Sequence, residues 1–375
     1  MSPIRVGLTA ALALISSLGL AQIDHVTIAA GTPEDKDLTT IGNEQDLQKK
    51  IAMFQDFLQK YSSNPMAVAF GNWQLAQTYQ SAGDFPKAAD AADKALVSSP
   101  RNLDILTSQV AISQQMHDGA RVFKYAVQGG GIYNSIDKQT KPENMSDEGF
   151  RDTVETEKQN NQNAYQFFQS SAFSVIGSET NAKTRMDYIE QFTATFPRSG
   201  LDEQLTSYAM MSLAEMQDNK RLIAYGEKAI AANPENMVAL LTLATTYVQS
   251  PETAAKAISY AQKAILLAKA DQPDATKSNK VSAGVAHCVV GRTYALQEKT
   301  LSSIAELKTA TSLLKGEDEQ QYAIAAYYLG WDYAKLKKLS EARAILTEGA
   351  AIPGSMQGAI KELLTKVNSA RAAGK

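Results

Sequence analysis

Few residues of this chain belong to the types that perform most enzyme chemistry. Among 375 residues there are three histidines, His25, His117 and His287, and no two stand at a spacing that places both on one face of a helix. His287 and Cys288 are neighbours, so on a helix their side chains point about 100° apart and cannot bind one metal ion. The His-x-x-x-His pair of helical zinc sites is missing. The sequence therefore predicts no metal site.

Motifs for phosphate and acyl transfer are missing as well. The chain contains neither the Gly-x-x-x-x-Gly-Lys-Ser/Thr loop that cradles phosphates nor the Gly-x-Ser-x-Gly turn of serine hydrolases. Two Ser-x-x-Lys matches, at 135–138 and 312–315, lack the Ser-Asp-Asn and Lys-Thr-Gly elements that serine acyl-enzymes need. Acidic residues such as Glu203, Glu227 and Glu306 are scattered along predicted helices, where a solvated face explains them. We therefore predict no catalytic residue, no cofactor and no enzyme activity.

The composition bounds the class of protein. A hydrophobic content of 44% allows a sizeable buried core, and a net charge of -3 without a basic stripe argues against nucleic acid as a partner. The only cysteine is Cys288, so no intramolecular disulfide can form. It stands in an apolar stretch, 285–290, where a free cysteine behaves as a small hydrophobic residue.

The first 21 residues have the features of a secretory signal peptide. Arg5 precedes an apolar run from Val6 to Leu20, and small residues lead to a predicted cleavage after Ala21. An uncleaved membrane anchor is the alternative, but the run falls short of the roughly 20 residues that span a bilayer core. We therefore expect a periplasmic or extracellular protein that does not span the membrane after cleavage.

A sequence pattern repeats along the chain. In the segment 72–100 (NWQLAQTYQSAGDFPKAADAADKALVSSP), large, small and proline residues fall at the spacing of a 34-residue helix-turn-helix: Leu75, Ala76, Tyr79, Gly83, Ala88, Ala92, Ala95 and Pro100. Related patterns follow at 203–234, where Met210, Leu222 and Gly226 depart from the usual types, and three more follow before Gly354. The five units together closely resemble the tetratricopeptide repeat.

The small residues in these units have a physical reason. Gly291 and Gly330 lie inside apolar helical stretches, where glycine costs about 1 kcal/mol relative to alanine. Close approach of a paired helix compensates for that cost. Ala88, Ala92 and Ala95 form a matching small stripe at i, i+4 and i+7 on the second helix of their unit.

The resemblance implies an all-α fold, a right-handed superhelical stack of antiparallel helix pairs. The expected parts are a signal peptide (1–21), an extended or mobile lead (22–45), N-terminal helices with a first repeat block (46–128), a loop (129–145), a long helix pair (146–200), a second repeat block (201–354), and a capping helix with tail (355–375). Residues 22–31 are expected to be mobile or to lie along the stack.

In the resembled family the first helix of each repeat lines a concave groove. The matching positions include Phe70, Trp73, Gln77 and Gln80 in the first unit and Arg292, Tyr327, Trp331 and Lys335 in the last two. Both tryptophans of the chain fall in this set, as aromatic anchors for a partner would. The alternative is that each tryptophan packs as ordinary core between repeats. Because Trp73 and Gln77 stand where chaperone-binding repeats place cationic and amide residues, the resemblance does not extend to a carboxylate clamp.

The predicted function is that of an exported scaffold that holds another protein or a peptide in its groove. An alternative is a cell-wall or glycan-binding module, in which Trp73, Tyr327 and Trp331 stack on sugar rings. Self-association through the stack ends or the groove is a third possibility. The sequence does not identify the partner.

Overall fold

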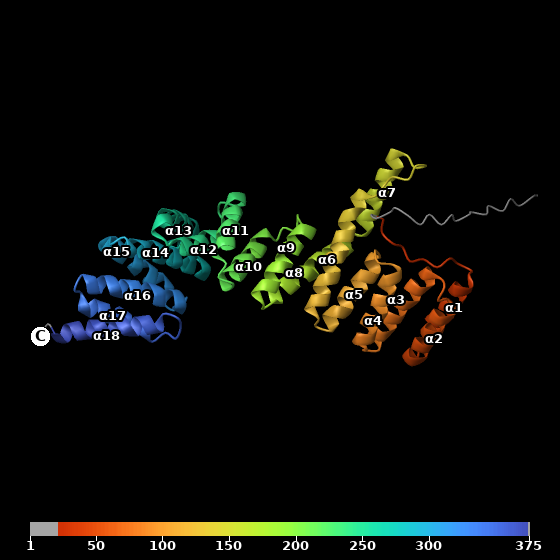
Figure 1. The fold of residues 1–375 in the computed structure, drawn as a ribbon, viewed down its shortest axis with the longest axis horizontal. Coiled ribbons are helices and arrows are strands. Elements are labelled where there is room, and N and C mark those ends of the chain that lie inside the picture. Colours follow the sequence, from red (N-terminus) through yellow and green to blue (C-terminus); the bar gives the residue numbers. More distant parts are fainter. Residues whose placement is uncertain (1–21, 374–375) are drawn as a thin grey trace, which may run out of the picture. The chain divides into compact units, whose positions relative to one another are not determined.

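The computed structural model describes residues 22–373, with the side chains of residues 22–369. The predicted signal peptide, residues 1–21, lies outside the described residues. Within residues 22–373 every regular element is a helix, which confirms the predicted all-α class (Figure 1). The chain divides into two compact units, each made of two segments. Unit 1 contains the chain up to Glu179 together with Glu190–Ser199. Unit 2 contains Thr180–Ile189 together with the chain from Gly200 onward.

Unit 1 is built from consecutive helices that pack on their neighbours. They are α1 (Pro33–Asn43), α2 (Leu47–Lys60), α3 (Pro65–Ser81), α4 (Phe85–Ser98), α5 (Leu103–Gln115), α6 (Gly119–Ser135), the short η1 (Ile136–Lys138), α7 (Asp147–Asn160) and α8 (Gln162–Ser178). Helix α9 (Ala182–Thr195) contributes its first half to unit 2 and its second half to unit 1.

Unit 2 continues the same plan. Its helices are α10 (Asp202–Glu215), α11 (Asn219–Ala232), α12 (Met237–Tyr247), η2 (Pro251–Thr253), α13 (Ala254–Ala268), α14 (Lys277–Leu296), α15 (Thr300–Leu314), α16 (Glu319–Lys335), α17 (Leu339–Ala350) and α18 (Gln357–Ala373). Each of these α-helices packs against the next one in the chain, as in a stack of helix pairs. At its C-terminal end, Ile360 and Val367 of α18 are buried against α17.

The helix starts follow local sequence signals. Side-chain oxygens of Asn64, Asp84 and Asn102 accept hydrogen bonds from backbone N–H groups in the first turns of α3, α4 and α5. Between α3 and α4 the chain turns at Gly83, whose φ of 76° lies in the left-handed region that favours glycine. The starts of α3, α4 and α5 are therefore fixed by residues that lie next to them in the sequence.

The predicted glycine seams are confirmed. A Cβ on Gly330 would lie 2.5 Å from side-chain carbons of Leu346, and one on Gly291 would lie 2.6 Å from Leu307. In α4 the stripe of Ala88, Ala92 and Ala95 is fully buried. The first and second helices of these pairs thus approach more closely than any larger residue would allow.

In the repeat at 203–234, whose residue types depart from the usual pattern, the large and the small residue have exchanged helices. Gly226 lies on the second helix of its pair, α11, and a Cβ there would lie 2.8 Å from Leu243 and 2.9 Å from Met210. Met210 and Leu222 are themselves buried. The large residue on the first helix is therefore matched by a glycine on the second, the reverse of the Gly330 seam.

The prediction of a loop at 129–145 is wrong for its first part. Residues 129–135 belong to α6, η1 follows, and irregular chain occupies only 139–146. Gly129 and Gly130 are buried, and a Cβ on either would clash with the ring of Phe168 or Phe196. The glycine run, which sequence analysis interpreted as a chain break, instead lets α6 approach these rings.

Two further boundaries differ from the sequence predictions. Residues 146–200 form three helices rather than a long pair, because the first is interrupted at Asn161 between α7 and α8. The lead expected to be extended or mobile at 22–45 contains helix α1, which begins where the sequence offers a side-chain cap, Thr32, followed by a proline. Residues 22–31 are non-helical and lie along unit 1: Ile23 is buried, and the Asp24 side chain accepts a 2.8 Å hydrogen bond from the backbone N–H of Arg101.

Candidate functional site

The first helices α10, α12, α14 and α16 of unit 2, together with the start of α11, line a cavity of about 620 Å³, here called the inner groove. Three glutamines and three threonines stand on its walls: Gln217, Gln249, Gln321, Thr242, Thr245 and Thr246. Leu222, Leu241 and Val285 supply its apolar surface. No residue that lines the cavity carries a charge. Leu241, Thr245 and Val285 stand at positions where the repeat resemblance places groove residues.

The polar groups of the inner groove are largely unengaged. Within the described chain, the side chains of Gln217, Gln249 and Gln321 and the hydroxyls of Thr242 and Thr245 make no hydrogen bond. The Thr246 hydroxyl donates a 2.8 Å hydrogen bond to the Thr242 carbonyl oxygen but can still accept one. A carboxamide both donates and accepts, so this wall can satisfy N–H and C=O groups of a ligand alike.

An aromatic and cationic cluster lies on α14 and α16, which also contribute Val285 and Gln321 to the groove. The Arg292 guanidinium lies 5.2 Å from the centre of the Tyr328 ring, Tyr328 meets Trp331 edge to face, and Lys335 Nζ lies 4.0 Å from the centre of the Trp331 ring. Cations over aromatic faces attract the ring quadrupole. The Nε atom of Arg292 is buried without a hydrogen-bond acceptor among the described residues.

The structure connects all four residues predicted on α14 and α16 through one ring, that of Tyr328. Arg292, Trp331 and Lys335 belong to one cluster, but through Tyr328, which sequence analysis did not select. The Tyr327 ring meets Tyr328 edge to face, and Tyr327 packs among residues of α17 and α18. Tyr328 lies seven residues after Gln321 and three before Trp331, and this spacing on one helix face was the signal that could have identified it.

The four residues predicted for the first unit lie on α3 in unit 1. Phe70, Trp73, Gln77 and Gln80 are all half-buried, and the rings of Phe70 and Trp73 meet edge to face. Trp73 Nε1 donates a 2.9 Å hydrogen bond to Ser108 Oγ on α5, the first helix of the next pair. Neither Trp73 nor Trp331 is fully buried, so both remain candidate anchors.

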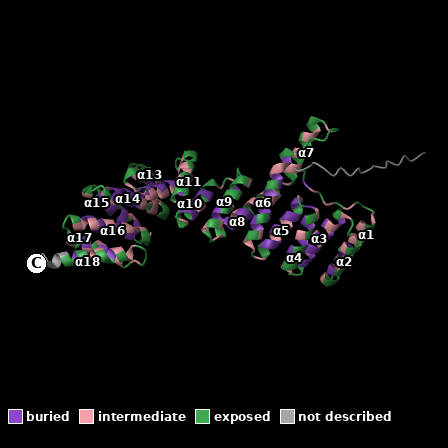
Figure 2. Ribbon diagram, in the orientation of Figure 1, coloured by how far each residue is buried: buried purple, intermediate pink, exposed green. Residues whose placement is uncertain are grey.

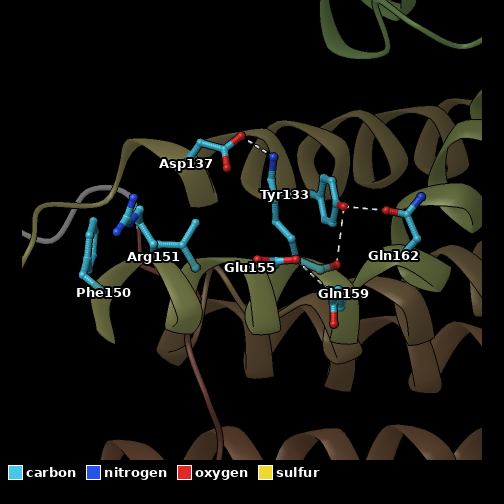
Figure 3. A pocket seen from close by; sticks show the side chains of 9 residues that line it. Tyr133, Asp137, Phe150, Arg151, Glu155, Gln159 and Gln162 are labelled. Carbon is cyan, nitrogen blue, oxygen red and sulfur yellow. Dashed lines mark hydrogen bonds and ion pairs between the residues drawn. The ribbon is translucent and has the colours of Figure 1, made fainter. Parts of the chain in front are cut away.

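Sequence analysis did not identify a second cavity of about 660 Å³, which lies between the end of α6 and α7 (Figure 3). Phe150 and Val154 of α7 form its apolar wall, and Tyr133 lines it from α6. Helix α7 contains no buried residue, as its green and pink colouring in Figure 2 shows. Phe150 and Val154 are the only apolar side chains longer than alanine on α7 and stand at i and i+4, which was the available sequence signal.

Most polar groups around this second cavity are already satisfied. Lys158 pairs with Asp137, and the Tyr133 hydroxyl donates a 2.6 Å hydrogen bond to Gln162 Oε1 (Figure 3). Gln159 donates to Glu155 at 3.1 Å. Arg151 makes no ion pair with another described residue. The cavity therefore presents a small apolar surface with one unpaired cation, a poorer recognition site than the inner groove.

Among the described residues, side chains of the types that bind metals or act as nucleophiles do not come together in a site. The described residues contain no group of three or more histidine, cysteine, aspartate or glutamate side chains placed to hold a metal ion. Burial raises the pKa of the Cys288 thiol to about 12, which disfavours the nucleophilic thiolate. Cys288 is part of the core with Leu307 and Leu329 and is absent from the groove lining, in keeping with its interpretation as a small hydrophobic residue. Residues 22–373 contain no helix that is both long and apolar enough to cross a bilayer.

Comparison with known proteins finds only weak likenesses, all of them to solved structures. No protein-family model and no curated protein sequence matches the chain. Among solved structures, a tetratricopeptide repeat protein from Parabacteroides merdae is similar at 12% identity and a TM-score of 0.36, over 80% of this chain and 98% of that one. The tetratricopeptide domain of P58(IPK) is similar at 9% identity and a TM-score of 0.34, over 92% and 99% of the two chains. Yeast Tom70 is similar at 12% identity and a TM-score of 0.29, over 91% and 95%.

Proposed function

We propose that the chain is an exported scaffold that binds an extended segment of another protein in the inner groove of unit 2. The observation that supports this is the set of unengaged carboxamide and hydroxyl groups of Gln217, Gln249, Gln321, Thr242 and Thr245 in one uncharged cavity. An extended peptide presents N–H and C=O groups in alternation along its length. Side chains that both donate and accept can match that alternation without a fixed register.

The groove also selects among peptides. Its lining has no charge, so a charged side chain entering it loses hydration without gaining a partner. Leu222, Leu241 and Val285 instead favour an aliphatic side chain. At the α14–α16 end, Tyr328 and Trp331 supply rings of the kind that dominate binding energy in protein interfaces. The preferred segment is uncharged and partly aliphatic.

The alternative is a glycan ligand, whose hydroxyls would suit the same amides. Sugar rings bind by stacking on open aromatic faces. Lys335 Nζ lies over the Trp331 ring, and Tyr327 packs against α17 and α18, so two of the three rings considered for stacking are partly engaged. This favours the peptide over the glycan. Binding assays with purified envelope polymers separate the two alternatives.

Export is part of the same proposal. The charged start, apolar run and small residues before Gln22 support removal of residues 1–21 on export to the periplasm or the medium. Intact-mass measurement of the chain recovered from envelope and medium fractions tests this step. A mass that begins at Gln22 supports it, whereas a full-length, membrane-held chain contradicts cleavage.

The groove is tested by photo-crosslinking in the native host. A photoreactive amino acid at Thr245 lies inside the inner groove, and the matched control replaces Ser259, an exposed residue of α13. We expect a discrete protein adduct from position 245 and none from 259. Adding Val285→Arg, which puts a charge in the uncharged groove, should abolish the adduct. Equal crosslinking from both positions, or an adduct that survives Val285→Arg, would contradict a peptide site there.

A further inference from the structure

Three exposed leucines gather on two hairpin turns of unit 2. Leu296 is the last residue of α14 and is 54% exposed, Leu301 is the second residue of α15 and is 75% exposed, and Leu336 caps α16 and is 38% exposed. Single exposed apolar residues are common on protein surfaces. Three on the turns that follow two successive first helices, α14 and α16, call for an explanation.

Both turns lie at one edge of the unit. Helices α14 and α16 are the first helices of successive pairs and pack against each other, while α15 packs against both. Since α15 runs opposite to each of them, α14 and α16 run in the same direction and end on the same side. The turns that follow them, 297–299 and 336–338, are therefore neighbours along this edge.

Lysines surround the leucines. Lys299 stands in the first turn, and Lys335, Lys337 and Lys338 stand at the second, all exposed. None of the four makes an ion pair with a described residue. The Nζ atoms of Lys299 and Lys335 instead lie over the rings of Tyr294 and Trp331. Glu298 is the acidic residue on these two turns and exposed Glu341 stands three residues after Lys338, so four lysines face two carboxylates and the edge is locally cationic although the chain carries a net charge of -3.

We propose that this edge, defined by Leu296, Leu301 and Leu336 with Lys299, Lys335, Lys337 and Lys338, docks on the surface of an anionic lipid membrane. Leucine tips gain free energy by entering the acyl boundary, and flexible lysine stems keep their charged ends at the level of the headgroups. Anionic lipid attracts each lysine near the surface. A bilayer also demands no shape complementarity from turns that project outward.

A soluble acidic macromolecule is the main competitor, because it would satisfy the lysines equally well. A soluble acidic polymer, however, offers the three leucines no apolar surface to contact. The two occupants therefore differ in one measurable respect: membrane docking needs both the leucines and the lysines, whereas an acidic polymer needs only the lysines.

Vesicle co-sedimentation of the chain from Gln22 onward tests the proposal, since omitting residues 1–21 removes their own apolar run. We expect binding to phosphatidylglycerol vesicles, weak binding to phosphatidylcholine vesicles, and loss of binding as salt rises from about 0.1 M to about 1 M. Neutralising Lys299, Lys337 and Lys338 to glutamine should lower the partition coefficient about fivefold for each lysine, on the order of 100-fold in all. The control neutralises Lys138, Lys183 and Lys220, exposed lysines elsewhere.

The leucines are tested separately by Leu296→Ser, Leu301→Ser and Leu336→Ser in one chain, matched by Val97→Ser, an 83% exposed apolar residue of unit 1. The leucine variant should lose vesicle binding and Val97→Ser should keep it. Circular dichroism confirms that each variant is folded. The proposal is overturned if phosphatidylglycerol is not bound, if the control lysines matter as much as the edge lysines, or if serine at the three leucines leaves binding unchanged. Equal binding to soluble polyglutamate, insensitive to the leucines, would also overturn it in favour of an acidic macromolecule.

Discussion

The three consecutive glycines of α6 should respond to alanine with opposite signs. Gly129 and Gly131 are two residues apart in the same helix, so alanine has the same intrinsic helix preference at both. At Gly131 no atom lies within 4 Å of the position a Cβ would take, and the residue is exposed. At Gly129 the new Cβ would clash with the ring of Phe168, which is fully buried.

The magnitudes follow from these surroundings. Gly131→Ala should stabilise the protein by about 0.5 to 1 kcal/mol, because alanine lowers the entropy cost of a helical backbone. Gly129→Ala gains the same amount but must displace a packed ring, which costs about 1 to 3 kcal/mol. The net expectation for Gly129→Ala is a loss of about 1 kcal/mol. The difference between the two variants should therefore be about 2 kcal/mol.

Chemical denaturation followed by circular dichroism measures both variants against the unchanged chain, with the slope compared to confirm that the same unit unfolds. Gly130→Ala, which meets Phe196, should behave as Gly129→Ala does. Equal effects at 129 and 131, or a destabilising Gly131→Ala, would refute the assignment of the glycine run to a packed helix.

Three further outcomes are expected. Asp332 is fully buried and its carboxylate has no hydrogen-bond partner among the described residues, since the Ser303 hydroxyl beside it donates to the Gly291 carbonyl oxygen. Burial raises the pKa of Asp332 in the folded state, so stability falls as pH rises from the unfolded value of about 4 through the folded pKa. Asp332→Asn should consequently be the more stable chain at pH 7, and denaturation below pH 4 should abolish the difference. Glu298→Gly should stabilise unit 2 by about 0.5 to 1 kcal/mol in denaturant titrations, because Glu298 has a φ of 60°, where a side chain is strained. Cys288 should react with a thiol reagent only at the rate of unfolding, and fast labelling of the native chain would contradict its burial.

Local signals allowed much of the fold to be predicted from sequence. The side chains of Asn64, Asp84 and Asn102 cap helices within three residues of their own positions, and Gly83 turns the chain where it stands. The 34-residue spacing of small and large residues predicts the pairing because successive helices are close in sequence. These features depend on neighbours along the chain, which the sequence displays directly.

For the candidate site, the sequence predicted which helices contribute residues and roughly which face they use, but not every residue. Arg292, Trp331 and Lys335 were identified from their place in the repeat, but the choice between Tyr327 and Tyr328 is a rotation of about 100° that depends on where α18 packs. The free carboxamides of the inner groove belong to α16 and the turns after α10 and α12, and its free hydroxyls belong to α12. Whether such side chains stay unengaged depends on helices that are distant in sequence.

The sequence by itself determined the helical class, the pairing of helices within the repeats and the starts of helices such as α3, α4 and α5, since these depend on interactions within a few residues. Only the tertiary structure decided that Gly129 and Gly130 belong to a helix, because the rings that require them, Phe168 and Phe196, stand far along the chain. It also decided which polar side chains remain free to bind, because a hydrogen-bonding group is available only where no distant segment of the same chain has engaged it.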